Sequence, residues 1–170
     1  MERLWSSWRL AYVTGAQTSQ GCVFCDALTT GEAAPLLLFR GRTCFVILNL
    51  FPYNNGHLMI VPNRHVASLA SLTPDERDEL MALAQRAERA VHEAYGPEGL
   101  NVGLNLGRPA GAGIVDHLHL HMVPRWNGDT NFMSVVGQVR VLPEELHSTA
   151  ARLRPIFDRL AAEAASAVHS

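Results

Sequence analysis

The chain contains no lysine, and all 14 of its basic residues are arginines. Schiff-base chemistry and the phosphate-binding P-loop both depend on a lysine, so neither belongs to this sequence. A phosphate-binding site must therefore be built from arginine, histidine, backbone N–H groups or a metal ion. The net charge of -2 also argues against a nucleic-acid partner, because general nucleic-acid binders carry a basic surface.

Long apolar runs are also absent. No segment approaches the length of a membrane span, and the N-terminus lacks the uninterrupted apolar core of a signal peptide. We therefore expect no membrane partner and a cytoplasmic location. Cysteine is scarce: Cys22 and Cys25 form a CxxC pair, and Cys44 stands apart in an apolar segment. In a reducing compartment such a pair indicates metal binding or redox chemistry rather than a structural disulfide.

The length of 170 residues, without an internal repeat or a long linker, predicts one domain over residues 1–170. Within it, residues 1–21 are predicted to form an arm that packs on the body or on a second subunit. Apolar runs bounded by turn residues predict five strands. These strands are expected at 35–40, 43–50, 57–62, 100–107 and 114–124.

Two helices are predicted. The first begins after Thr73, which can act as N-cap with Pro74 at the first helical position and Glu76 completing a capping box. It ends at Gly96. The second is expected within residues 143–168, where Pro155 should bend or interrupt it. Strands joined by hairpins, with separate helices, indicate an α+β fold with an antiparallel sheet.

Three histidines, His117, His119 and His121, alternate with apolar residues in the stretch DHLHLHMV. On a strand such residues share one face, at steps of roughly 6–7 Å. The pattern has three explanations: exposed histidines without a function, a three-histidine metal site, or nucleophilic catalysis. Histidines in a line do not converge easily on one ion. A line suits attack by the middle imidazole between flanking donors, so the third explanation is favoured.

The triad and its surroundings resemble the histidine-triad (HIT) family of nucleotidyl hydrolases and transferases. The segment 49–65, NLFPYNNGHLMIVPNRH, is similar to the family's upstream segment, and the predicted long helix falls where the family has one. The stretches VPRWNGDTNFM, VLPEEL, LWSSWRLAY and GCVFC resemble the branch of diadenosine tetraphosphate phosphorylase-like proteins. The resemblance implies the histidine-triad fold, with an antiparallel sheet of about five strands, a long central helix and a C-terminal helix, in a homodimer.

The resemblance also implies roles for individual residues. His119 would attack the α-phosphorus of a nucleotide, and His121 would donate to a non-bridging phosphate oxygen. His57 would orient the attacking ring, and His117 would complete the catalytic set. Asn49 sits where the family binds ribose hydroxyls, although a turn residue at a strand end is an equal explanation for it.

A phosphate-facing loop is the next implied feature. Asn105 would belong to it, together with Gly111, Ala112, Gly113, Ile114 and Val115. Small residues let backbone N–H groups approach an anion, although such a loop alone is usually only a turn. Members of the hydrolase branch often carry Gln or Ser at the position of Gly113. This departure leaves the acceptor of the nucleotidyl group open, and Arg125 is a candidate for the cationic charge that an incoming phosphate needs.

Some histidine-triad relatives close a metal site with two cysteines, the histidine of a P-x-x-H motif and the first triad histidine. Here these residues are Cys22, Cys25, His65 and His117, which implies a structural zinc ion. A pair of buried free thiols is the alternative. Thioredoxin-like redox chemistry is less suitable, because no βαβ unit surrounds the CxxC pair.

The sequence thus predicts nucleotidyl transfer or hydrolysis on dinucleoside polyphosphates such as diadenosine tetraphosphate, through a covalent nucleotidyl-histidine intermediate. Phosphorolysis is favoured over hydrolysis by a modest margin. Two other functions stay open: a phosphoramidase or hydrolase of AMP conjugates, and a nucleotide-binding sensor without turnover. The intact histidines at 57, 117, 119 and 121 argue against the sensor.

Overall fold

The computed structural model describes residues 21–29, 34–129 and 144–167. The predicted arm lies outside these ranges except for Gly21, and so do the stretch LWSSWRLAY and parts of VPRWNGDTNFM and VLPEEL. None of the helices in these ranges combines the length and apolarity that a membrane crossing requires.

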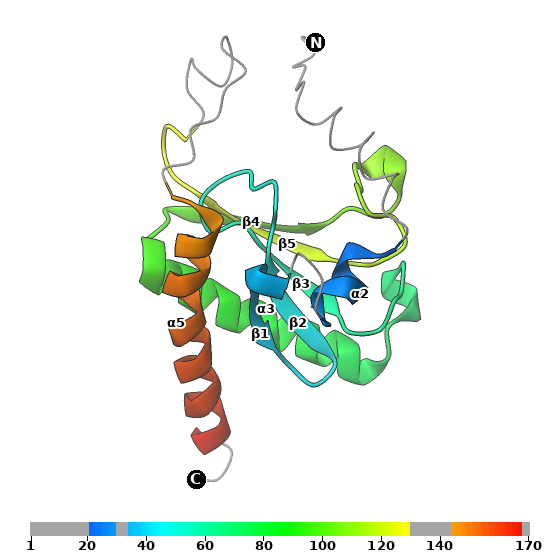
Figure 1. The fold of residues 1–170 in the computed structure, drawn as a ribbon, viewed down its shortest axis with the longest axis horizontal. Coiled ribbons are helices and arrows are strands. Elements are labelled where there is room, and N and C mark those ends of the chain that lie inside the picture. Colours follow the sequence, from blue (N-terminus) through cyan, green and yellow to red (C-terminus); the bar gives the residue numbers. More distant parts are fainter. Residues whose placement is uncertain (1–20, 30–33, 130–143, 168–170) are drawn as a thin grey trace.

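Five strands form one antiparallel sheet in the order β1-β2-β3-β5-β4 (Figure 1). The strands are β1 (Leu37–Arg40), β2 (Cys44–Leu48), β3 (Leu58–Pro62), β4 (Gly99–Leu104) and β5 (Leu120–Arg125). Short helical segments, α2 (Val23–Ala27), η1 (Ala34–Leu36), η2 (Leu69–Ser71) and η3 (Arg108–Ala110), lie in the connections. The predicted α+β fold with an antiparallel sheet and separate helices is confirmed.

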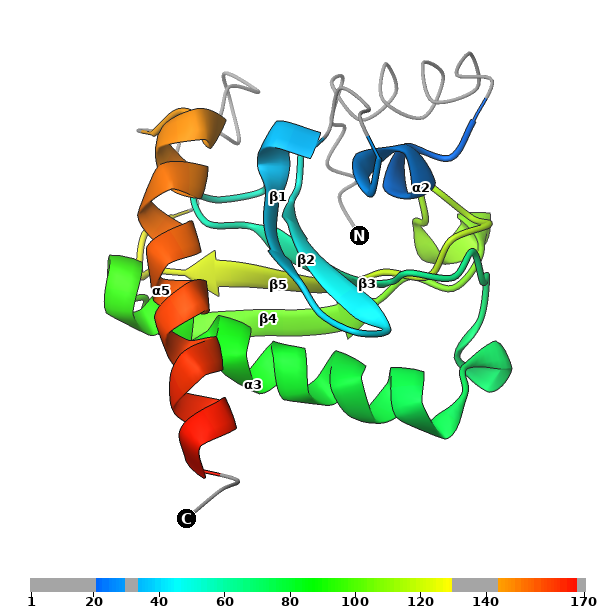
Figure 2. The ribbon, with the colours of Figure 1, turned by 60° about the horizontal axis from the view of Figure 1, so that its bottom comes forward.

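The helix α3 (Pro74–Tyr95) begins as its sequence predicts. The Thr73 side chain accepts from the Glu76 N–H, the Glu76 carboxylate accepts from the Thr73 N–H, and Gly96 ends the helix in a left-handed conformation. Its apolar side, with Leu83, Ala87 and Val91, is buried against the sheet. The helix α3 contacts β2, β3 and β5, and Figure 2 shows α5 (Leu146–Ala167) crossing its end.

Pro155 does not interrupt α5, which runs through it. A proline inside a helix loses one backbone hydrogen bond and crowds the preceding turn. The neighbouring side chains Leu153, Phe157 and Leu160 are buried in the core on the same helix. Packing of this apolar face offsets the local cost, since tertiary contacts supply most of a helix's stability in a protein.

The strand predicted at 114–124 begins only at Leu120. Leu120 pairs with Leu104, the last residue of β4, so the backbone before it has no partner on that side. The Leu118 N–H instead donates to the Val66 carbonyl at 2.6 Å. Of the three triad histidines, only His121 lies in the strand, and the other two stand on irregular backbone before it.

Candidate functional site

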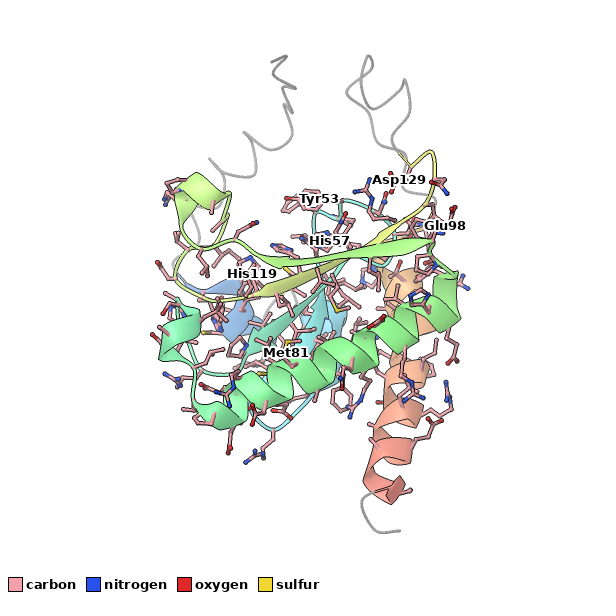
Figure 3. The ribbon with its side chains drawn as sticks, turned by 180° about the vertical axis from the view of Figure 1, so that it is seen from behind. Tyr53, His57, Met81, Glu98, His119 and Asp129 are labelled. Atoms are coloured by element: carbon pink, nitrogen blue, oxygen red, sulfur yellow. The ribbon has the colours of Figure 1, made fainter. Side chains whose placement is uncertain are left out.

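The predicted catalytic histidines fall into two groups. The rings of His119 and His121 lie 4.8 Å apart between centroids, and those of His57 and His121 lie 5.2 Å apart. His117 pairs instead with His65, at 4.9 Å. Figure 3 shows His57 above the paired strands β4 and β5, His119 near the start of β5, and the helix α3 below.

A single hydrogen bond sets the protonation of His119. Its Nδ1 lies 2.8 Å from the His117 carbonyl oxygen, and a carbonyl can only accept, so Nδ1 carries the proton. The other nitrogen, Nε2, then keeps its lone pair. The ring is only 5% exposed, and burial lowers the pKa of His119 below its ordinary value. A neutral imidazole with a lone pair on Nε2 is the nucleophilic form.

A chain of hydrogen bonds orients His57 and His121. The Tyr53 backbone N–H donates to Nδ1 of His57 at 3.0 Å, so the proton of the neutral ring is on Nε2. This Nε2–H lies 3.0 Å from Nδ1 of His121 and donates to it. The remaining proton of His121 is therefore on Nε2. Each hydrogen bond in this chain therefore donates in the same direction, from the Tyr53 backbone to His57 and from His57 to His121, which leaves the Nε2–H of His121 free to donate.

Both rings of this relay stay neutral. Burial, with the nearby His121 and His119 as smaller causes, lowers the pKa of His57 to about 3. Burial, followed by the neighbouring His119, lowers the pKa of His121 to about 4. At neutral pH neither ring is charged, so each keeps the single proton that the hydrogen bonds assign to it.

The turn between β2 and β3 brings His57 to this place. Gly56, which precedes it, has a φ of +72°, and a Cβ there would lie 3.1 Å from the Tyr95 ring. Asn54 ties the turn to β5, because its side chain donates to the Pro124 carbonyl at 2.9 Å and to Asp129 at 2.7 Å. The Tyr53 ring stacks on His57 with an interplanar angle of 19°.

Asn49 lies in the same turn. Its Oδ1 accepts from the Phe51 N–H at 3.0 Å, which is the role of a turn residue. Its Nδ2 lies 3.4 Å from Nε2 of His57, so the amide is next to the histidine relay. The structure therefore accounts for Asn49 as a turn residue, and its predicted contact with a ribose stays a prediction.

The predicted phosphate-facing loop starts at Asn105, directly after β4. Gly107 and Gly111 adopt φ values of +83° and +95°, and the N–H of Ala112 returns to the Gly107 carbonyl at 3.2 Å. These bonds close a compact turn before residues 113–115 and the triad. Arg125, the predicted cation, forms a two-pronged ion pair with Asp129 at 2.6 and 2.7 Å and is committed to that partner.

A second cluster contains the four predicted metal ligands. One ligand atom from each of Cys22, Cys25, His65 and His117 lies within 4.8 Å of all the others. Nδ1 of His117 is 3.2 Å from the Cys22 sulfur and 3.7 Å from the Cys25 sulfur, and Nδ1 of His65 is 3.4 Å from the Cys25 sulfur. Sulfur and nitrogen ligands of one tetrahedral zinc lie about 3.5 Å apart, so the donor set fits such an ion.

His117 serves both groups, through different atoms. Its Nε2 donates to the Pro62 carbonyl at 2.8 Å, so the lone pair is on Nδ1 and faces the cysteines. Its carbonyl holds His119. Two aromatic neighbours of the histidines were not predicted: Tyr53 beside His57, and Phe24 beside His119. The sequence signals available for them were the motif GCVFC, which contains Phe24, and the motif FPYNNG, which contains Tyr53.

Comparison with known proteins agrees with this arrangement. The profile of the HIT domain family matches residues 30–128. The AP-4-A phosphorylase of Mycobacterium tuberculosis is 41% identical over 157 residues, which cover 88% of this chain and 80% of that protein. A bis(5'-adenosyl)-triphosphatase of Dictyostelium discoideum is 29% identical over 72% of this chain and 85% of its own length.

Among solved structures, a Zn-bound histidine triad family protein from Mycobacterium smegmatis is similar to this chain. It is 30% identical, has a TM-score of 0.67, and the match covers 88% of this chain and 99% of that one. This chain therefore shares its fold with a histidine triad family protein of known structure.

The histidine relay makes a prediction about protonation. Long-range ¹H–¹⁵N NMR spectra should show the Nε2–H tautomer for His57 and His121, unchanged from pH 8 to pH 5. Because the pKa values are lowered to about 3 and about 4, the rings should take up protons only below this window. An unfolded histidine binds its proton near pH 6.5, so falling pH should also lower the free energy of unfolding. A midpoint near 6.5 for either ring would contradict the relay.

Proposed function

The chain belongs to the HIT family, and on that premise we propose that it cleaves dinucleoside polyphosphates by passing a nucleotidyl group through His119. The observation that carries the proposal is the lone pair on Nε2 of His119, fixed by the bond from Nδ1 to the His117 carbonyl. The names of two relatives, an AP-4-A phosphorylase and a bis(5'-adenosyl)-triphosphatase, support this substrate class.

The reaction has two displacements at one phosphorus. Nε2 of His119 attacks the α-phosphorus, an N–P bond forms, and the bond from phosphorus to the bridging oxygen breaks, which releases the rest of the polyphosphate. An oxygen of the acceptor then attacks the same phosphorus and the N–P bond breaks. His119 is regenerated in its starting tautomer, and the proton of the acceptor leaves with the product or to solvent.

His121 and His57 stabilise the charge that develops at phosphorus. The Nε2–H of His121 donates to a non-bridging oxygen, and His57 holds it in that tautomer. Neutral donors suit this task, because they need no counter-ion in a buried site. Asn49 holds the nucleoside, and Asn105 and the backbone of residues 111–115 face the phosphate.

We assign phosphate, rather than water, as the preferred acceptor. The relative named AP-4-A phosphorylase shares 41% identity with this chain, and a phosphorylase uses phosphate. Arg125 is paired with Asp129, which makes an arginine without such a partner the better candidate for the cation. Within the described ranges, every other arginine has a carboxylate, carbonyl or aromatic partner except Arg108, at the start of η3 in the glycine loop. Arg108 is our candidate for binding the incoming anion.

One zinc ion, held by Cys22, Cys25, His65 and His117, is the proposed cofactor. A closed tetrahedral site of this kind supplies folding free energy and leaves no open coordination position for a substrate. The ligands come from α2, from the segment after β3 and from the residues before β5, so they connect parts of the chain that are distant in sequence.

We further propose a cytoplasmic homodimer of this single domain. In the sheet, β4 is an edge strand, whose unpaired backbone groups are available to a second copy. Val102 on β4 and Met81 on α3 are large apolar side chains that are 53% and 55% exposed. Two such apolar edges can cover each other about a twofold axis.

Replacement of the nucleophile should abolish turnover. We expect His119→Ala to lower kcat on diadenosine tetraphosphate by several orders of magnitude, because the covalent route is lost. His121→Ala should lose about 10²–10³-fold, as for one transition-state donor. His92→Ala, on an exposed part of α3, is the control. Turnover of His119→Ala near the wild-type rate would exclude the covalent mechanism.

Metal analysis tests the zinc proposal. Protein purified without added metal should contain one zinc per chain, and Cys22→Ser/Cys25→Ser should contain none and have a lower Tm, since the site contributes to folding. Cys44→Ala is the matched control, because this thiol lies in the core away from the cluster. Wild-type protein that is free of metal and equally stable in a chelator would reject the site.

The products of cleavage identify whether phosphate or water accepts the nucleotidyl group. Across a phosphate titration we expect the rate of diadenosine tetraphosphate cleavage to rise and the products to be ADP and ATP, rather than AMP and ATP. Arg108→Ala should raise the phosphate concentration needed for half-maximal rate about tenfold while cleavage by water persists. Arg77→Ala, at an exposed ion pair on α3, is the control. If AMP dominates at every phosphate concentration, the enzyme is a hydrolase.

A further inference from the structure

We infer that Phe24 is a positioning residue for His119, and that the cysteine helix α2 acts on the nucleophile through it. The inference rests on the proposed role of His119 and extends it to a residue outside the histidine motif. Phe24 stands between the two cysteines, on the short helix α2, which reaches both the metal-ligand cluster and the catalytic group.

The contacts of the Phe24 ring are specific. Its centroid lies 5.0 Å from the His119 ring, at an interplanar angle of 47°, and 5.4 Å from the His117 ring, at 77°. The side chain is only 2% exposed and belongs to the main core. Phe24 therefore fills the space beside both imidazoles and excludes water from that side of the nucleophile.

His119 needs such a support. Its ring makes one hydrogen bond among the described residues, from Nδ1 to the His117 carbonyl, which fixes the position of one ring atom and leaves the ring free to tilt about that bond. Tilting moves Nε2, the attacking atom, away from its line to phosphorus. An aromatic ring packed against the imidazole removes this freedom, and rates of attack are sensitive to displacements of about 1 Å.

The position of Phe24 depends in turn on the cysteines. The helix α2 has five residues and no side-chain cap, and a helix of that length is not stable by itself. Cys22 and Cys25 contact His117 and His65 on either side of Phe24. Whatever fixes the two sulfur atoms therefore fixes the phenyl ring between them. The metal-ligand cluster and the nucleophile are linked by this ring as well as by the His117 backbone.

The test compares Phe24→Ala and Phe24→Leu with Val23→Ala. Val23 is on the same helix but is 40% exposed. In the resting protein, Phe24→Ala should shift the His119 ring resonances, because the ring current of Phe24 is lost. It should also lower kcat about 10–100-fold with KM changed less than about threefold, because misplacement affects attack and not binding.

Phe24→Leu, which keeps an apolar side chain of similar reach, should recover most of kcat without restoring the resonances. It is also the working variant if Phe24→Ala fails to fold. Val23→Ala should match the wild type in both measurements, and the Phe24 variants should keep their metal. Unshifted His119 resonances, or a kcat loss equal to that of Val23→Ala, would overturn the inference.

Loss of metal from Phe24→Leu would also overturn it, since the effect would then run through the cluster. The NMR measurement needs no substrate. If the wild type fails to cleave dinucleotides, the proposed function fails, while the contact between Phe24 and His119 is still tested by the spectra.

Discussion

The hydrogen bond from Nδ1 of His119 to the His117 carbonyl is the interaction on which the site depends. It decides which nitrogen of His119 can attack, and it requires that the backbone carbonyl of His117 be free of the sheet. That condition is met because β5 begins only at Leu120. A regular strand through all three histidines would direct this carbonyl to a neighbouring strand. Irregular backbone before the strand therefore sets the tautomer of His119, the proposed nucleophile.

The three histidines of this segment lie in two different environments. His121, inside β5, is oriented by a relay from the β2–β3 turn, whereas His117 faces the cysteines and is held by the Pro62 carbonyl. His119 stands between them, with Phe24 from α2 beside it. His119, the proposed nucleophile, is thus supported from the side of the predicted metal ligands, and His121, its proposed transition-state partner, is supported from the side of the turn.

Local features were predictable from the sequence, and long-range ones were not. The capping box of Thr73 and Glu76 acts within one turn of helix, and the strands follow from apolar runs between turn residues. The predicted start of β5 at residue 114 was wrong. The strand begins where it can pair with the end of β4, and the alternation of residues 117–122 does not decide this. The group of Cys22, Cys25, His65 and His117 could be inferred only from family resemblance, since no local pattern specifies contacts between residues so distant in sequence. The relay through the Tyr53 backbone has no side-chain signature.

The chain has no lysine, and this bears on why the histidines of the site are held as neutral hydrogen-bond donors. Almost every arginine in the described ranges is tied to a partner, so in the proposed reaction the centre of the site would meet the charge of a phosphate with neutral imidazoles and backbone groups. Neutral donors are effective only if each proton is on the correct nitrogen, because an imidazole turned or tautomerised the wrong way presents a lone pair to an anion. Fixed tautomers, rather than fixed charges, are what the turn, the His117 carbonyl and the buried core provide. A site of this kind tolerates burial that a lysine or an unpaired arginine would not, and burial in turn keeps the histidines neutral.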